Sequence, residues 1–271
     1  MHRPICRDRP TVLLIVLLAG VFAGTPTPST AASERDAQAM VILQRMADFL
    51  SRAQHISITA EIGFDVVQAS GEKLEFGETR QFLIRRPDRL QVDITKRDGS
   101  TSGFRFDGQE IAVFNTREQV YATAAKPGTL DEAIAYFIND LDMRFPLAEF
   151  FSTRLAESLA AKVRTAYNVG AERIMGVPCE HVALRGDQND MQLWVAQGDQ
   201  PLPCRLVITY RAAEGQPQFW AQFSDWSLSP DVSDAQFAFT PPEGATRIAF
   251  AARKPVPTIE GKQKGKKGAR P

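Results

Sequence analysis

Residues 85–123 read RRPDRLQVDITKRDGSTSGFRFDGQEIAVFNTREQVYAT, a succession of short segments in which apolar and polar residues alternate. Alternation with a period of two is typical of β-strands that bury one face. Asp98-Gly99 and Asp107-Gly108 separate the segments, and such pairs are a strong hairpin signal because Gly tolerates the positive φ of the turn. The stretch predicts an antiparallel meander and leaves little room for catalytic residues.

The N-terminus has the pattern of a secretory signal peptide. Three arginines precede an apolar run at residues 12–23. A cleavage site of the small-x-small type follows and ends at Ala31. The run is shorter than the roughly 20 residues that a membrane-spanning helix needs. We therefore expect cleavage of residues 1–31 and a periplasmic location, with an uncleaved N-terminal anchor as the alternative.

Charge is balanced overall, with 32 basic and 32 acidic residues, but it is unevenly distributed. The body is acidic, which is not the footprint of a nucleic-acid-binding protein. Residues 251–271 are rich in Lys, Gly and Pro without apolar periodicity, so we expect a disordered basic tail. The tail either contacts anionic lipid headgroups or serves as a solubilising terminus.

Residues 32–250 are expected to form one domain. Residues 34–53 place apolar side chains every three to four positions, which is typical of an amphipathic helix. Strands at 56–67 and 72–85 lead into the meander. After the meander, the spacing of apolar residues changes from that of a strand to that of a helix. A capping box of Thr129 and Glu132 begins this helix. The elements expected next are two short helices, after Pro146 and at residues 154–160, and a second block of strands over residues 164–228.

This order of elements predicts a mainly β fold of the α+β class. An antiparallel sheet of that many strands must curl, and its concave face must be covered. We expect a strongly curved antiparallel sheet that forms an incomplete barrel, covered on its concave side by the N-terminal helix and the central short helices.

Signatures of catalysis and of metal binding are missing. The chain has no HExxH, no CxxC and no phosphate-binding loop in an ordered context. Thr101 lies in a Gly-flanked segment that resembles a nucleophile elbow, but the segment is a hairpin rather than a strand-to-helix turn. His55 and His181 remain after cleavage, and a single His in a strand is typical of packing. We expect a protein that is not an enzyme and needs no cofactor.

Cys179 and Cys204 each begin a predicted strand, and export permits a disulfide between them. If one strand lies between them, two inter-strand steps of about 4.8 Å exceed the usual Cα separation of a disulfide. The sequence therefore leaves two alternatives for this pair, a Cys179–Cys204 disulfide or two buried free thiols.

Aromatic and aliphatic side chains are frequent on both the predicted sheet and the predicted helices. The simplest interpretation is a sheet-on-helix core. Our hypothesis is that part of this core is a ligand cavity gated by the helix that begins at Thr129, since helix-covered hollows lined by apolar side chains favour ligands. The predicted lining residues are Phe82, Ile84, Leu90, Val92, Phe104, Phe106, Ile134, Phe137, Ile138, Phe150, Phe219 and Phe223.

Two runs, RRPDRL at residues 85–90 and FDGQEIAVFN at 106–115, resemble runs of the periplasmic lipoprotein carriers of the LolA and LolB type. Together with GVPCEH at 176–181, SDW at 224–226 and FTPP at 239–242, they make the chain similar to a group of predicted periplasmic proteins of the DUF2092 type. The resemblance spans most of residues 35–250, and it implies a carrier-like fold.

The resemblance also implies a role for Arg86, because in the carriers the Arg of this Arg-Pro pair is associated with holding the lid helices closed. A surface ion pair is the alternative for Arg86. At Phe114 the carriers more often have Tyr, and this departure leaves the cargo open.

We therefore expect a periplasmic protein that binds a lipid, acyl chain or lipoprotein in an apolar cavity and releases it by moving helices. Such transfer needs no cofactor, since burying each CH₂ of an acyl chain contributes about 0.8 kcal/mol and opening the lid removes that contribution. The alternative is a non-catalytic envelope sensor or interaction module that binds a membrane-anchored partner on the same fold.

Overall fold

The computed structural model describes residues 36–140 and 146–250. These residues all belong to one compact unit of the chain, Ser33–Pro271. The predicted signal peptide at residues 1–31 and the predicted tail at residues 251–271 lie outside the described residues, so both stay predictions.

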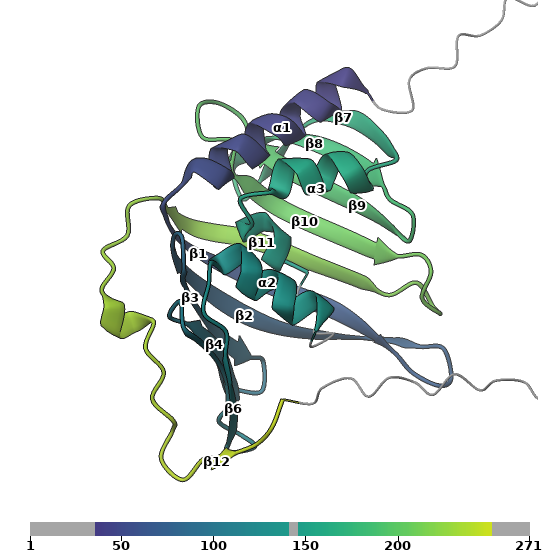
Figure 1. The fold of residues 1–271 in the computed structure, drawn as a ribbon. Helices are drawn as coiled ribbons and strands as arrows, with labels where there is room; N and C mark the ends of the chain where they lie inside the picture. Colours follow the sequence, from purple (N-terminus) through teal and green to yellow (C-terminus); the bar gives the residue numbers. More distant parts are fainter. Residues whose placement is uncertain (1–35, 141–145, 251–271) are drawn as a thin grey trace, which may run out of the picture. The chain divides into compact units, whose positions relative to one another are not determined.

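Twelve strands of the described chain form one sheet (Figure 1). Strands β1–β6 and β7–β11 are two blocks in which consecutive strands pair antiparallel, and the blocks join where β1 pairs with β11. The sheet ends at β12 and β7, which do not pair, so it is an incomplete barrel as predicted. The strands are β1 (His55–Val67), β2 (Lys73–Arg85), β3 (Arg89–Lys96), β4 (Thr101–Phe106), β5 (Glu110–Asn115), β6 (Val120–Ala125), β7 (Thr165–Ile174), β8 (Val177–Arg185), β9 (Asn189–Ala196), β10 (Pro203–Tyr210), β11 (Gln218–Ser227) and β12 (Thr246–Arg247).

The Asp-Gly turns of the first block form as predicted. Gly99, between β3 and β4, has a φ of +81°, and Gly108, between β4 and β5, has a φ of +85°. A side chain at this φ would be strained, which explains why Gly stands at both turns. Asp107 Oδ1 accepts the backbone N–H of Gln109 at 2.9 Å and holds the second turn.

Helix α1 (Ala37–Arg52) covers the second block of strands (Figure 1). Asp36 is its N-cap and accepts the N–H of Gln38 at 2.7 Å, which is why the helix begins slightly later than the apolar pattern predicted. Arg45 reaches the carbonyl of Gly198, between β9 and β10, at 3.0 Å. The apolar face of α1 is fully buried through Ala39, Ile42, Leu43, Met46, Ala47 and Leu50.

Helix α2 (Leu130–Asn139) covers the first block and begins with the predicted capping box. The N–H of Thr129 donates to Glu132 Oε2 at 2.7 Å, and the N–H of Glu132 donates to Thr129 Oγ1 at 3.3 Å. The 3₁₀ turn η1 (Ala148–Phe151) and helix α3 (Leu155–Lys162) follow and confirm the two predicted short helices. In Figure 1, α3 lies beside α1 over the second block.

The C-terminal segment returns to the first block. It contains the 3₁₀ turn η2 (Asp234–Gln236) and ends in β12, which pairs parallel with β6. The ring of Phe239 stacks on Phe114 of β5 with centroids 5.9 Å apart. Sequence patterns did not predict β12, because two residues carry no periodicity.

Cys179 and Cys204 lie together in a second, smaller cluster of buried residues with Trp194. A register shift between Pro203 and Arg205 interrupts the pairing of β10 with β9 at Cys204. Burial, followed by hydrogen bonding to Cys179, raises the pKa of the Cys204 thiol. Both residues are free thiols in this structure, and the two alternatives for this pair stay expectations.

Candidate functional site

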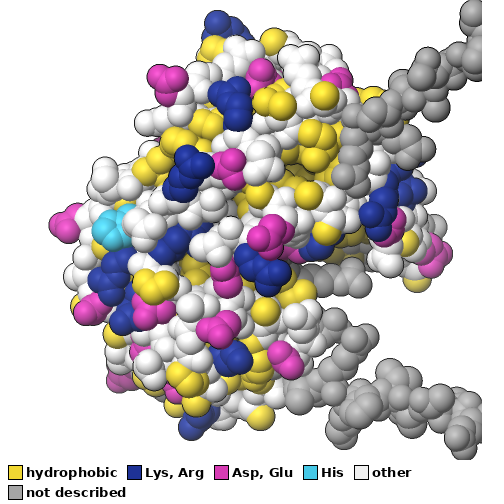
Figure 2. All heavy atoms as spheres, turned by 45° about the horizontal axis from the view of Figure 1, so that its top comes forward, with side chains coloured by type: hydrophobic (Ala, Val, Ile, Leu, Met, Phe, Trp, Pro, Cys, Tyr) yellow, Lys and Arg dark blue, Asp and Glu magenta, His cyan; other side chains and the backbone are white. Residues whose placement is uncertain are grey.

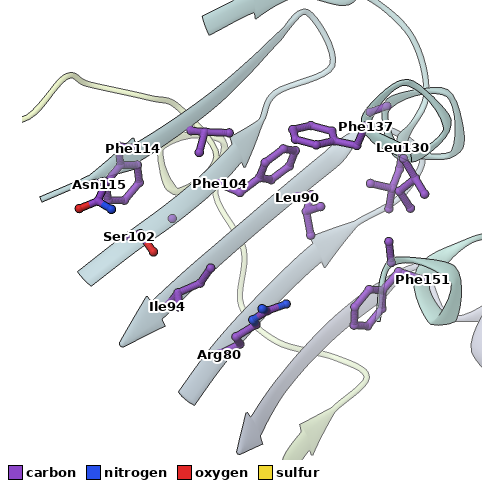
Figure 3. Close-up of a pocket in the computed structure, with 15 residues that line it drawn as sticks. Arg80, Leu90, Ile94, Ser102, Phe104, Phe114, Asn115, Leu130, Phe137 and Phe151 are labelled. Carbon is purple, nitrogen blue, oxygen red and sulfur yellow. The ribbon is translucent and has the colours of Figure 1, made fainter. Parts of the chain in front are cut away.

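A cavity of about 310 Å³ lies between α2, η1 and strands β2–β5 (Figure 3). Pockets for small ligands occupy about 300–1,000 Å³, so this one is at the small end of that range. Its lining residues are Arg80, Leu90, Ile94, Ser102, Gly103, Phe104, Val113, Phe114, Asn115, Leu130, Ala133, Ile134, Phe137, Ala148 and Phe151.

The helical side of the cavity is apolar. Helix α2 contributes four residues at a spacing of three and four, which places them on one helical face. The ring of Phe137 meets Phe104 of β4 edge-on, with centroids 4.6 Å apart. On η1, the ring of Phe151 packs on Phe82 of β2 with centroids 4.8 Å apart. The four residues of α2 are Leu130, Ala133, Ile134 and Phe137.

The polar side chains of the cavity lie on the strands. Arg80, Ser102 and Asn115 stand away from α2 in Figure 3, while the apolar residues Leu130 and Phe137 stand on the helix. The cavity is therefore apolar under α2, and its polar end, on β2, β4 and β5, carries Arg80, Ser102 and Asn115 with Ile94 of β3 between Arg80 and Ser102.

Arg80 forms an ion pair with Glu78 on the same strand. Its Nε donates to Glu78 Oε1 at 2.6 Å, and its Nη2 contacts the same oxygen. Only 13% of the Arg80 side chain and 8% of the Glu78 side chain are exposed. Burial of an ion is tolerated when a counter-ion accompanies it, and here the guanidinium reaches the cavity already paired.

The turn between β2 and β3 holds the N-terminus of α2. The N–H of Leu130 donates to the carbonyl of Pro87 at 2.7 Å, which satisfies one of the free amides of the first helical turn. On the other side of the turn, the N–H of Arg86 donates to the carbonyl of Gln54 at 2.8 Å. The Arg-Pro pair thus connects the end of α1 to the start of α2.

The side chain of Arg86 is buried in this connection and is not a surface ion pair. It is 8% exposed, and its Nε donates to the carbonyl of Ala53 at 3.0 Å. Both Nη atoms are buried and have no hydrogen-bond partner among the described residues. Burial lowers the pKa of the Arg86 guanidinium, and the carboxylate of Asp131 in α2 opposes this effect. Arg86 is therefore a buried cation whose acidic neighbour lies in the first turn of α2.

Four of the predicted lining residues lie on the cavity wall, namely Leu90, Phe104, Ile134 and Phe137. The other eight do not line this cavity. Ile138 of α2 is 36% exposed and does not line the cavity. On β11, Phe223 meets Phe150 of η1 with centroids 6.2 Å apart, so η1 fills the space beside that strand. The residues that are buried in the core but do not line the cavity are Phe82, Ile84, Val92, Phe106, Phe150, Phe219 and Phe223.

Sequence reasoning missed the polar end, since Arg80, Ser102 and Asn115 are not among the predicted lining residues. The period of two that selected Phe82 and Phe104 also leads to Arg80 and Ser102, two positions earlier on the same strands. The cavity prediction rests only on the apolar residues of these strand faces. A charged residue that continues an otherwise apolar strand face was the available signal.

The residues considered for chemistry are separated and hydrogen-bonded. Thr101 of β4 bonds to Thr116 at 2.8 Å. His181 of β8 stacks on Trp194 and lies between Glu172 and Gln192 at 3.1 and 3.2 Å. Within the described ranges, no group of three or more His, Cys, Asp or Glu residues could hold a metal ion.

A family model described as "Predicted periplasmic protein (DUF2092)" matches residues 39–251. The chain belongs to this family. The matched range contains both blocks of strands and every residue of the cavity. The description of the DUF2092 family supports the periplasmic location that the N-terminal pattern predicts. No curated protein matches the chain.

The solved structures that match this member of the DUF2092 family share little sequence with it. The lipoprotein LppX of Mycobacterium tuberculosis has 14% identity and a TM-score of 0.45, covering 73% of this chain and 100% of that chain. A LolA superfamily protein of Nitrosomonas europaea has 14% identity and a TM-score of 0.37, covering 74% and 97%. The MucA/MucB complex of Pseudomonas aeruginosa has 19% identity and a TM-score of 0.40, covering 75% and 62%. Likeness at this level does not assign a function, which has to be argued from the site.

The face of the molecule that Figure 2 shows carries mixed charge. Figure 2 shows Lys and Arg side chains interspersed with Asp and Glu on this face, so it gathers no large patch of one sign. That distribution differs from the basic stripe of nucleic-acid-binding domains. Among the helices that the structure describes, none is long and apolar enough to cross a membrane.

Proposed function

We propose that the protein is a non-catalytic carrier that binds an acyl chain, as part of a lipid or a lipoprotein, in the cavity under α2. The observation that supports this function most strongly is the apolar hollow of about 310 Å³ between the short helix and the first block of strands. Each CH₂ group buried there contributes about 0.8 kcal/mol, which is sufficient for binding without any cofactor.

Release of the chain is proposed to depend on α2. The buried residues of this helix are Leu130, Ala133, Ile134 and Phe137, and all four line the cavity. A bound chain is covered only while α2 stays in place, so displacement of α2 exposes the chain to water and weakens its binding.

Arg86 is proposed to hold α2 in the closed position, as the resemblance to the carriers implies. Its Nε anchors the guanidinium to Ala53 at the end of α1, and Asp131 in the first turn of α2 provides the attracting charge. Asp131 also accepts the N–H of Thr153 at 3.0 Å, which ties the start of α2 to the segment after η1. The three contacts meet at the N-terminal end of the lid.

The proposal is tested by placing a charge on each side of α2. The Phe137→Asp variant puts a carboxylate on the cavity wall, and we expect it to weaken binding of a fluorescent acyl probe by about a hundredfold because the charge resists desolvation. The Ile138→Asp variant is the matched control, since Ile138 is the neighbouring residue, is 36% exposed and does not line the cavity. We expect it to bind the probe like the unaltered protein.

Equal binding by Phe137→Asp and the unaltered protein would mean that α2 does not cover the site. Circular dichroism establishes whether each variant is folded, and Ala133→Phe, which fills the cavity without a charge, replaces Phe137→Asp if that variant unfolds. An unaltered protein that binds no acyl probe would exclude the carrier and favour the interaction module.

A further inference from the structure

The polar end of the cavity constrains the kind of lipid that fits. Of the described residues that line the cavity, Arg80 is the one with a charged side chain. Glu78 balances that charge, with Oε1 2.6 Å from Arg80 Nε. Glu78 is itself buried and does not line the cavity. A ligand therefore meets the N–H groups of a guanidinium whose charge is already balanced.

Charge balance disfavours an anionic headgroup at this position. A carboxylate or phosphate that enters an apolar cavity loses its hydration, and this cost is offset only by a counter-ion that is available to it. Here the cation already has a buried carboxylate as its partner, so an anionic ligand would leave two negative groups around one guanidinium. Like charges that close to one another disfavour ionisation of both.

An uncharged headgroup with hydrogen-bonding oxygens meets no such penalty. Arg80 can donate to an ester carbonyl, and the hydroxyl of Ser102 can donate to or accept from a ligand hydroxyl. Asn115 Oδ1 accepts the N–H of Glu118 at 3.1 Å, which leaves its amide NH₂ group as the donor toward the cavity. These groups come from β2, β4 and β5 and lie at the end of the cavity away from α2 (Figure 3).

We propose that the cavity selects a single-chain amphiphile with an uncharged, ester-type headgroup, such as a monoacylglycerol, over an ionised fatty acid of the same chain. The acyl chain lies under α2 against Phe104 and Phe137, and the ester and hydroxyl groups contact Arg80, Ser102 and Asn115. A volume of about 310 Å³ accommodates one chain rather than several. This inference rests on the proposed function, since it concerns the same cavity.

The test is competition against a bound fluorescent acyl probe by glycerol monolaurate and by laurate at neutral pH, both below their aggregation concentrations. For the unaltered protein we expect glycerol monolaurate to bind about tenfold or more tightly than laurate. The Glu78→Gln variant keeps an oxygen that accepts from Arg80 but removes the balancing charge. In this variant we expect laurate to bind about tenfold more tightly than in the unaltered protein, with glycerol monolaurate changed by less than about threefold.

Laurate that binds the unaltered protein as tightly as glycerol monolaurate would overturn the inference and leave the proposed function intact. The same holds if Glu78→Gln leaves the preference unchanged. Failure of the probe and of both competitors to bind would instead reject the proposed function. If Glu78→Gln does not fold, Glu78→Asn provides the second test, because it also removes the balancing charge and must tighten the binding of laurate relative to glycerol monolaurate.

Discussion

The two blocks of the sheet are covered in different ways. Over β7–β11, the 16-residue helix α1 buries a continuous apolar stripe, and α3 packs beside it. Over β1–β6, the 10-residue helix α2 covers a cavity of about 310 Å³ that lies beside the buried core residues of this block. The inward face of β2 also carries an ion pair, Glu78 with Arg80, where a packed core would have apolar residues.

This difference separates stability from binding within one sheet. A buried ion pair contributes little to stability compared with apolar side chains of similar volume, and a cavity forfeits packing contacts. The first block therefore carries two features that do not favour folding, and both lie at the same site. The second block, with the fully buried face of α1, provides packing that offsets the stability lost to the cavity and the ion pair.

The largest expected effect comes from adding the same ring to each block. Ala47 of α1 and Ala133 of α2 are both fully buried. Ala47→Phe overpacks the filled core and should lower the free energy of unfolding by about 2 kcal/mol. Ala133→Phe places its ring in the cavity, so it should change that free energy by less than about 1 kcal/mol and abolish acyl-probe binding. Chemical denaturation and probe titration measure the two effects.

Equal destabilisation by the two substitutions would show that the space beside Ala133 is not available to a side chain. Retention of probe binding by Ala133→Phe would place the bound chain elsewhere. Either result removes the distinction between the packed and the hollow block.

A smaller effect is expected at the turn between β2 and β3, which connects the end of α1 to the start of α2. Arg86→Leu removes the cation beside Asp131, and we expect the bound acyl probe to leave about tenfold faster because closure of α2 loses a charged contact. Arg89→Leu is the matched control at the start of β3, directly after this turn, since Arg89 pairs with Asp88 at 2.9 Å and does not line the cavity. Stopped-flow transfer of the probe to vesicles measures the rate. Equal rates for both variants would remove the lid-holding role of Arg86.

The smallest effect is expected at the start of the lid. Thr129→Ala removes the N-cap of α2 and should cost about 1 kcal/mol, confined to this helix. Hydrogen–deuterium exchange should then speed up in residues 130–139 and stay unchanged in α1. Faster exchange in both helices would mean that α1 and α2 open together.

Acid should have the same local effect as this substitution. The backbone hydrogen bond from Thr129 lowers the pKa of Glu132 in the folded protein. The contribution of Glu132 to the cap is therefore complete above its unfolded-state pKa and is lost as the pH falls through the lowered value.

The elements of this fold were predictable where local signals mark their ends. Asp107-Gly108 forms a turn because Gly accepts the positive φ, and Thr129 with Glu132 begins α2 because each satisfies a free amide of the other. Strand β12 gave no such signal, because its pairing with β6 is a long-range contact between two short segments.

The cavity was less predictable than the fold for a physical reason. Phe104 and Phe106 lie on the same face of β4, yet Phe104 lines the cavity whereas Phe106 is fully buried in the core. Periodicity indicates which face a residue occupies, but not whether a helix side chain fills the space opposite it. That depends on the length and position of the covering helix, which are tertiary properties.

Native mass spectrometry of the protein purified from the periplasm without detergent tests the central claim most directly. We predict a fraction of molecules that carry the added mass of one acyl lipid in the unaltered protein and none in Ala133→Phe, because the substituted ring occupies the cavity under α2. An unaltered protein that is always ligand-free and that takes up no acyl lipid offered to it would contradict the account.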